Sequence, residues 1–352
     1  MESTLSPENT IEYISQPAFL VKNGLIETVN EAAANMQIKV GTSIHELLKA
    51  GAEDYAEFRS GRLYLQLSAG RAWVTICNDA QLFCIEDDYS TPELKALALA
   101  AQQLRAPLSN AMSGIELLKQ NEALPENNSL KQQISSINRS IHSILRAVCN
   151  MSDANPADIG CKANLQVQNA SSVFLEIFEK VSGYIEESGR SLNFSGLKMP
   201  LQCVMDSQLM ERAILNIVSN AIKFSPVNST ITASVKQTKT RLSVTIENAV
   251  TEEHASMYHR FFQQYRRMPG IEDGLNGIGL GMSIVSGIMA AHAGTVLLDS
   301  SKKKTARITL SFPIHTNTTI LRSPIQLLGG YTGGIDSYLV ELADVLPNRY
   351  YE

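Results

Sequence analysis

The chain has 352 residues, which at roughly 150 residues per domain predicts two or three domains. Apolar residues make up 44% of the sequence, so there is enough material for packed cores and a wholly disordered chain is excluded. The net charge is −5, from 30 basic and 35 acidic residues. This balance argues against a protein that binds nucleic acid non-specifically.

No apolar run approaches the roughly 20 residues that a membrane-spanning helix needs, and residues 96–101 are typical of the longest runs. The first ten residues are acidic and polar, without the basic start and apolar centre of a secretory signal. The five cysteines are scattered and form no C-x-x-C pair, which favours reduced thiols over a disulfide framework or a zinc site. We therefore expect no membrane span and a cytoplasmic location.

The first segment, residues 10–88, contains short strand-like runs with a few helical turns between them. Residues 17–21 and 25–29 flank Asn23-Gly24, and Asn-Gly supplies the positive φ angles of a tight hairpin turn. Strand, Asn-Gly, strand and then a helix starting near Asn30 resembles the beginning of a PAS sensor domain. The alternative interpretation is an unrelated small α+β module, and neither interpretation names a ligand.

The second segment contains two uninterrupted heptad patterns, which predict two long amphipathic helices joined by the polar turn 121–128. The first pattern consists of Leu94, Leu97, Ala101, Leu104, Leu108, Ala111, Ile115 and Leu118; the second consists of Leu130, Ile134, Ile137, Ile141, Ile144, Val148 and Met151. Two such hairpins would close a four-helix bundle, so we expect a homodimer through residues 94–151. The alternative is a hairpin that docks only on its own chain.

The third segment, residues 160–315, alternates helical and strand patterns, which predicts one mixed sheet with helices on a face. The helices are expected at 172–188, 207–224 and 282–291, and the strands at 201–204, 230–235, 242–246, 295–298 and 306–312. The remaining residues, 316–352, carry a glycine-rich run and a short helical pattern at 335–345. Nothing in the sequence assigns them a role.

One motif in the third segment places two amides, a cation and an aromatic ring on one helix face. Asn216, Asn220, Lys223 and Phe224 stand at i, i+4, i+7 and i+8 of the predicted helix. Carboxamide oxygens suit Mg²⁺ and a lysine suits a phosphate group. By itself, the pattern favours two amides that are satisfied by hydrogen bonds of the helix.

A second motif, Gly277-Ile-Gly-Leu-Gly281, is followed at once by a helical pattern. Glycines before a helix N-terminus let backbone amides approach a phosphate, and the helix dipole adds attraction for an anion. No strand precedes the motif directly, so it is not a Rossmann unit.

Together the two motifs resemble the ATP-binding domain of sensor histidine kinases, within the group shared with gyrase-type and heat-shock-chaperone ATPases. Residues 216–224 match the N box, 277–281 match the second glycine box, 261–266 resemble the F box, and His292-Ala-Gly294 resembles the turn after the following helix. The resemblance covers roughly residues 94–313 and implies an α/β sandwich that binds ATP and Mg²⁺.

The resemblance implies a role for each matched residue. Asn220 would bind Mg²⁺ with support from Asn216, Lys223 would contact phosphate, and Phe224 would line the nucleotide pocket. The glycine box, which here comprises Gly277, Gly279, Leu280 and Gly281, would let a lid and a helix close on the phosphates.

Two departures from the family pattern affect function. The first glycine box, Asp-x-Gly in the family, aligns on Asn248-Ala-Val250, so an amide replaces the carboxylate that accepts from adenine and a side chain replaces a glycine. This change predicts weakened ATP binding. The phosphoacceptor motif aligns on residues 102–108 with Leu104, Pro107 and Leu108 retained, but Gln102 replaces the acceptor histidine and Gln103 replaces the adjacent acid. An uncharged amide is a very poor nucleophile, so we expect no autophosphorylation.

No other histidine is expected to take the place of the acceptor. His142 lies beside the second heptad pattern and, reflected about the turn, faces roughly position 107, so we expect a solvated helix histidine. His45, His254, His259 and His315 show no spacing typical of metal ligands.

The sequence thus predicts four parts: a PAS-like module (1–90), a dimerisation hairpin (91–155), an ATP-binding kinase-like domain (160–315) and a C-terminal extension (316–352). The preferred interpretation is a homodimeric pseudokinase that binds ATP·Mg²⁺ and a response regulator or another histidine kinase. An active sensor kinase, or a response-regulator phosphatase in which Gln102 or Gln103 positions a water, remains open. An ATPase without a signalling role is disfavoured by the hairpin.

Overall fold

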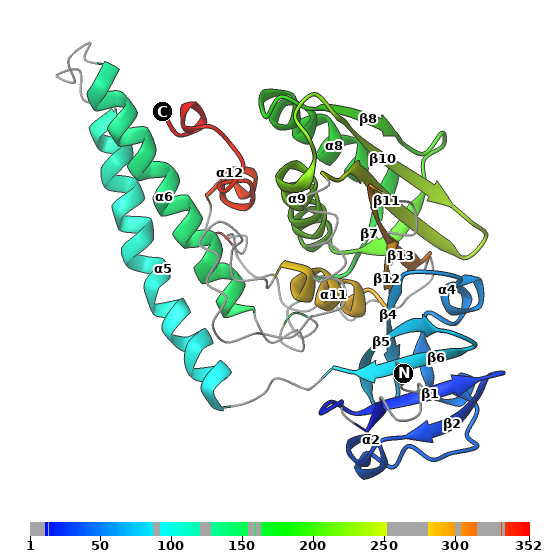
Figure 1. Cartoon of the computed structure of the whole chain (residues 1–352). Helices are drawn as coiled ribbons and strands as arrows, with labels where there is room; N and C mark the ends of the chain where they lie inside the picture. The colour runs from blue at the N-terminus through cyan, green and yellow to red at the C-terminus, as the bar shows by residue number, and fades with distance from the viewer. Residues whose placement is uncertain are drawn as a thin grey trace, which may run out of the picture.

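The structure is a computed structural model (Figure 1), and it describes residues 11–12, 14–86, 92–119, 128–153, 159, 163–251, 281–299, 304–314, 332 and 335–352. In the description below, residues 14–86 are called the N-terminal segment, residues 163–314 the α/β region and residues 335–352 the C-terminal strap.

The N-terminal segment begins with the predicted hairpin. Strands β1 (Ala18–Lys22) and β2 (Leu25–Val29) pair antiparallel around Asn23 and Gly24, whose φ angles are 52° and 79°. Asn30 then caps the next helix, because its side-chain oxygen accepts from the amide of Ala33 at 2.9 Å. The elements that follow are α2 (Glu31–Asn35), α3 (Ile44–Leu47), β3 (Leu48–Ala50), α4 (Ala52–Glu57), β4 (Arg62–Leu67), β5 (Gly70–Cys77) and β6 (Ala80–Ile85).

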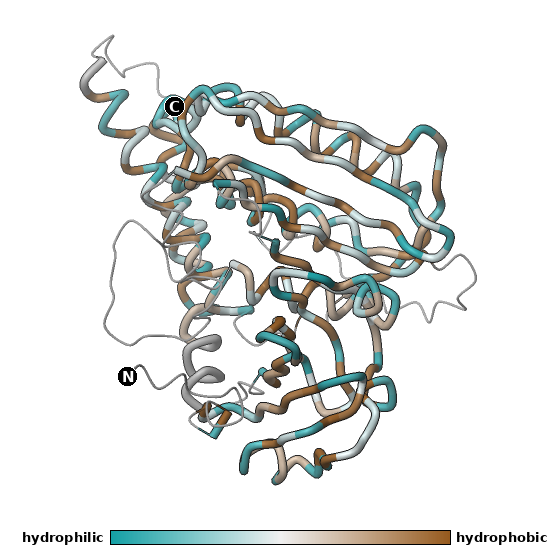
Figure 2. Tube along the Cα trace, turned by 45° about the vertical axis from the view of Figure 1, so that its right-hand side comes forward, coloured by the Kyte–Doolittle hydropathy of each residue, from teal (hydrophilic) through white to brown (hydrophobic). Residues whose placement is uncertain are grey.

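The second segment forms two long helices, α5 (Pro92–Lys119) and α6 (Asn128–Ser152), that pack side by side (Figure 1). Polar and apolar residues alternate along both helices (Figure 2), and the heptad patterns divide into two sets. Alternate seam positions are buried or half-buried: Ala101, Leu108, Ile115, Ile134, Ile141 and Val148. The intervening seam positions are exposed, apart from the half-buried Met151: Leu104, Ala111, Leu118, Leu130, Ile137 and Ile144. One hairpin therefore covers only half of its own apolar surface.

The α/β region is a mixed sheet whose helices α8, α9 and α11 share one core with the inner face of the strands. Strand β8 runs parallel to β10, and the pairs β10–β11, β11–β13 and β12–β13 are antiparallel. The elements are β7 (Gln166–Asn169), α8 (Ala170–Glu187), β8 (Ser191–Ser195), β9 (Gln202–Met205), α9 (Ser207–Phe224), β10 (Thr230–Gln237), β11 (Arg241–Ala249), α11 (Gly281–Ala291), β12 (Thr295–Asp299) and β13 (Thr305–Pro313). The sequence predicted this mixed sheet but missed strands β7 and β8.

The N-terminal segment and the α/β region share one sheet, which the sequence did not predict. Strand β4 pairs antiparallel with β12, and this pair joins the two sheets into one of 11 strands. Asp54 reinforces the junction: its carboxylate pairs with Arg241 at 2.7 Å and accepts from Ser311 at 2.9 Å. Gly61 allows the close approach, since a Cβ there would lie 2.1 Å from the carbonyl oxygen of Leu298.

The C-terminal strap folds into α12 (Ser337–Glu341) and the short 3-10 helix η1 (Asn348–Tyr351). Figure 1 shows it in red between α6 and the helices of the α/β region. The predicted helix at 335–345 is therefore shorter than expected, and the strap occupies an interface rather than extending into solvent. Most of the glycine-rich run that precedes it lies outside the described residues.

Candidate functional site

Helix α9 is fixed at its start by a capping network. The carboxylate of Asp206 accepts from the amides of Gln208 and Leu209, each at 3.0 Å. The amide of Asp206 donates in turn to Nε2 of His292 at 3.0 Å, and Nδ1 of His292 lies 2.7 Å from the carbonyl oxygen of Ile288. These two contacts select the neutral imidazole with its proton on Nδ1, and burial lowers the pKa of His292. The His292 turn thus positions α9 from the far end of α11.

The amide and lysine motif lies on α9, as the spacing predicted. Asn216 is 1% exposed, and its Nδ2 donates to the carbonyl oxygen of Arg212 at 3.0 Å and to Glu341 at 3.2 Å. Its Oδ1 has no hydrogen-bond partner within the described part of the chain. Asn220 is half-buried, and among the described residues it makes no hydrogen bond. A buried amide oxygen without a partner has a high desolvation cost, so this face is suited to a hard cation or a donor.

The last glycine of the second motif begins α11 directly beside Asn216. A Cβ on Gly281 would lie 2.8 Å from Oδ1 of Asn216, so only glycine allows this close approach. The structure therefore brings the two sequence motifs together at this point. Gly277, Gly279 and Leu280 lie outside the described residues, as do residues 261–266 of the predicted F box.

The departure at the first glycine box has a visible structural consequence. Asn248 lies near the end of β11, is buried, and donates to the carbonyl oxygen of Ala249 at 2.8 Å. Val250 follows the strand and packs with Ala306 against the ring of Phe224. An isopropyl group therefore fills space beside Phe224 that a glycine would leave open. Lys223 lies nearby, with Nζ 5.8 Å from the centre of the Phe224 ring.

The predicted phosphoacceptor motif, residues 102–108 (called the frame below), lies on α5. Gln102 and Gln103 are both exposed. Burial raises the pKa of the Cys149 thiol on α6, and the charges of Arg105 and Arg212 act to lower it. Helix α9 contacts the hairpin through Arg212, which stands one turn before Asn216 and bonds to Asn150 of α6.

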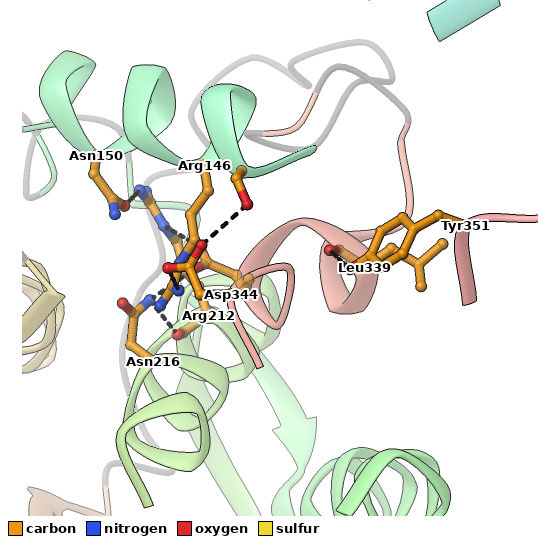
Figure 3. A network of polar contacts seen from close by, with 9 residues as sticks. Arg146, Asn150, Arg212, Asn216, Leu339, Asp344 and Tyr351 are labelled. Atoms are coloured by element: carbon orange, nitrogen blue, oxygen red, sulfur yellow. Dashed lines mark hydrogen bonds and ion pairs between the residues drawn. The ribbon is translucent and has the colours of Figure 1, made fainter. Parts of the chain in front are cut away.

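The structure adds a buried charge network that the sequence analysis did not predict. Arg212 is 1% exposed and bonds to Asp153 at 2.6 Å, to Asn150 at 3.3 Å and to Glu341 at 3.3 Å (Figure 3). Glu341 also pairs with Arg146 of α6 at 3.2 Å. The signal in the sequence was an arginine on the same helix face as Asn216, four residues earlier. Its partners could not be identified without the tertiary structure.

The prediction of a solvated His142 was wrong. His142 is buried, its Nδ1 lies 2.8 Å from the carbonyl oxygen of Asn138, and its ring packs edge-on against Tyr351 of the strap at 4.9 Å. Burial lowers its pKa. A helix histidine became buried because the strap covers this face of α6. Within the described part of the chain no cluster of three metal-binding side chains occurs.

The described helices include none that is long and apolar enough to cross a lipid bilayer.

Comparison with known proteins identifies the class. The model of the histidine kinase-, DNA gyrase B- and HSP90-like ATPase family matches residues 205–316. The chain is 30% identical over 238 residues to the probable sensor kinase SilS of Salmonella typhimurium. This alignment covers 64% of this chain and 46% of SilS. It is 25% identical over 232 residues to the sensor histidine kinase CusS of Escherichia coli. This alignment covers 64% of this chain and 47% of CusS. The chain thus spans about half the length of these relatives.

Two solved structures are similar at a lower level. Full-length ShkA in complex with AMPPNP has a TM-score of 0.48 and 19% identity, over 64% of this chain and 46% of that chain. Histidine kinase ThkA in complex with the response regulator TrrA has a TM-score of 0.36 and 14% identity, over 88% of this chain and 98% of that chain.

Residues 205–316 are therefore an ATPase domain of the histidine kinase, gyrase and HSP90 type. Over 64% of its length, the chain is similar to sensor kinases such as SilS and CusS.

Proposed function

We propose that this chain is a histidine-kinase-type signalling protein that binds ATP·Mg²⁺ but does not phosphorylate itself. The observation that supports this most directly is that the two retained motifs meet in space while the acceptor position holds an amide. A Cβ on Gly281 would lie 2.8 Å from Oδ1 of Asn216, yet the exposed side chain at position 102 is a glutamine. An amide has neither the nucleophilic nitrogen nor the basicity of imidazole.

The residues present fit a magnesium–nucleotide complex. Asn220 would hold the metal, supported by Asn216, whose buried Oδ1 has no partner within the described part of the chain. When bound, Mg²⁺ would neutralise phosphate charge. Lys223 would contact a phosphate, Phe224 would line the nucleotide pocket and Asn248 would accept from the adenine amino group. Gly281 at the start of α11 would leave room for the phosphates, together with Gly277, Gly279 and Leu280.

Nucleotide binding is tested by calorimetric titration of the full chain with ATP and MgCl₂. Asn220→Ala is expected to reduce affinity at least tenfold. Gln208→Ala is the matched control, because Gln208 is an exposed amide on the first turn of the same helix. Equal affinities in all three proteins, or no binding by the unmodified chain, would contradict the assignment of this site.

We also propose that the chain is a homodimer through residues 94–151. The exposed half of each heptad pattern supports this, since Ile137 is 55% exposed and Ile144 is 49% exposed on a continuous apolar face. A second copy of the same hairpin offers the matching pattern and would complete a four-helix bundle. Light scattering should give twice the chain mass, and the Ile137→Arg, Ile144→Arg double variant should give a monomer. Leu175→Arg on α8, with Leu175 46% exposed, is the control that should remain dimeric.

The remaining parts complete the proposal. Residues 1–90 would be a PAS-like sensor module, 91–155 the dimerisation hairpin, 160–315 the ATP-binding domain and 316–352 a C-terminal extension. The partner would be a response regulator or another histidine kinase in the cytoplasm. The free cysteines found among the described residues are consistent with that location.

A second candidate function is dephosphorylation of a bound response regulator. The exposure of Gln102 and Gln103 favours it, because both carboxamides can reach a docked protein and position a water. The test is to mix this chain with a labelled, phosphorylated response regulator and to measure the loss of label. Loss of label that the Gln102→Ala variant does not produce would support this function in place of a purely non-enzymatic role.

A further inference from the structure

The C-terminal strap bonds to the hairpin along several turns of α6. Asn138 donates to the carbonyl oxygen of Tyr351 at 2.9 Å, and Nε of Arg139 donates to the carbonyl oxygen of Ala343 at 2.9 Å. About two turns further along, Arg146 pairs with Asp344 at 2.7 Å. These contacts involve both backbone and side chains of the strap, so its register on α6 is fixed.

The same strap packs into the α/β region. Its aromatic residues Tyr338 and Tyr350 both pack against the Tyr184 ring of α8, at centroid distances of 5.8 and 5.2 Å. Ser337 donates to Glu211 of α9 at 2.5 Å, and Nζ of Lys180 lies 3.8 Å from the centre of the Tyr338 ring. The strap therefore contributes to the core of the α/β region as well as to the surface of the hairpin.

Glu341 joins the two sides at one point. It is fully buried, and its carboxylate contacts Arg146 of the hairpin, Arg212 of α9 and the amide of Asn216 (Figure 3). One carboxylate thus pairs with an arginine of the hairpin and an arginine of α9, and it also accepts a hydrogen bond from Nδ2 of Asn216. Removing it would leave Asp153 as the one remaining carboxylate partner of the buried Arg212, and Asp344 as that of Arg146, among the described residues, which is unfavourable.

These contacts hold α9 against α6, whereas the frame residue Gln102 lies on α5. Because Arg212 is bonded to Asn150 and Asp153 at the end of α6, α9 cannot move relative to the hairpin without breaking these contacts. The strap opposes that movement because it is bonded to both helices.

We propose that residues 335–352 are an intramolecular restraint that holds the nucleotide domain in a docked, non-transferring orientation, with Glu341 as its central contact. The proposal deepens the proposed function, since it concerns the regulation of the same nucleotide site. Release of the strap frees α9 and the amide of Asn216 together.

The first test measures hydrogen exchange of the full chain without nucleotide. Glu341→Gln keeps the shape of the side chain and removes its charge, and it is expected to raise exchange at least tenfold in α12, η1 and residues 138–150 of α6. Asp344→Asn is a milder variant that weakens the contacts of Asp344 with Arg146 and Ser143, and it should raise exchange in the same segments to a smaller extent. Glu352→Gln, at the exposed last residue, is the control. Unchanged protection in both strap variants overturns the proposal.

The second test uses the Gln102→His, Gln103→Glu chain with γ-labelled ATP and Mg²⁺. Adding Glu341→Gln is expected to raise the rate of labelling severalfold, and an unchanged or slower rate would show that the strap does not inhibit. If the Gln102→His, Gln103→Glu chain takes up no label with or without Glu341→Gln, the result contradicts the ATP-binding proposal. The hydrogen-exchange result, which needs no nucleotide, then decides alone whether the strap is a restraint.

Discussion

A methyl group at Gly281 would lie 2.8 Å from Oδ1 of Asn216, so the start of α11 and the middle of α9 are in direct contact. The two positions are 65 residues apart and belong to the two motifs of the proposed nucleotide site. Their contact explains why a glycine must end the second motif. It also makes the site sensitive to a single added carbon atom.

Gly281→Ala is expected to displace Asn216 and to lower the free energy of unfolding by about 1–3 kcal/mol, the usual cost of overpacking. ATP·Mg²⁺ affinity should fall with it, because the displaced amide supports Asn220. Gly183→Ala on α8 is the control, since a Cβ there meets nothing within 4 Å. That variant should gain up to about 1 kcal/mol from helix propensity. Calorimetry and thermal unfolding measure both quantities, and equal effects of the two substitutions would contradict the contact.

Opening the space beside Phe224 is expected to strengthen ATP binding, whereas Gly281→Ala is expected to weaken it. Val250→Gly removes the isopropyl group that packs on Phe224, and Asn248→Asp restores a charge-assisted acceptor for adenine. The double variant should bind ATP about tenfold more tightly, while its melting temperature without nucleotide should fall because buried apolar contacts are lost. Titration calorimetry and thermal unfolding separate the two effects. Affinity that falls in parallel with stability would argue against a nucleotide pocket at this place.

The shared sheet predicts that the N-terminal segment is energetically coupled to the α/β region. Asp54→Ala leaves Arg241, which is largely buried, without its carboxylate partner. We expect a loss of about 1–3 kcal/mol for this partly exposed pair. Faster amide exchange in β4 and β12 should accompany the loss. Asp79→Ala breaks an exposed pair with Lys22 and should change stability far less, because solvent screens such a pair. If Asp54→Ala leaves exchange in β12 unchanged, the junction does not contribute to coupling.

The strap should bind less firmly in acid. Burial lowers the pKa of His142, while Lys119 also lowers it and Asp336 raises it. Below the ordinary histidine pKa of about 6.5, the released state takes up a proton that the docked state does not bind. Docking therefore weakens as the pH falls below about 6.5. His142→Phe keeps a ring against Tyr351 without a titratable group, so its strap protection should not change over the same range. A pH dependence that persists in this variant would assign the effect to another group.

The sequence predicted the elements that a local pattern determines. Residues 207–224 form the expected helix because Asp206 caps it and apolar residues recur with helical period, and the Asn23-Gly24 turn follows from its positive φ angles. The two heptad patterns predicted α5 and α6, and their spacing also explains why half of the apolar positions are exposed. In these cases the local and the tertiary preferences agree.

The features that were missed depend on contacts between distant segments. The pairing of Leu63 with Leu297 needs an edge strand on each of two sheets, and nothing in either strand specifies the other. Glu341 looked like one of many surface carboxylates, because its counter-charges Arg146 and Arg212 lie 195 and 129 residues away. His142 was misjudged for the same reason, since its cover comes from Tyr351.

The central claim is that an ATP-binding kinase scaffold has lost the group that receives the phosphate. Incubation of the dimeric full chain with γ-labelled ATP and Mg²⁺, followed by measurement of acid-labile protein-bound phosphate, tests it most directly. The account predicts no label in this chain and measurable label in the Gln102→His, Gln103→Glu variant. Stoichiometric acid-labile phosphate on the unmodified chain would contradict it.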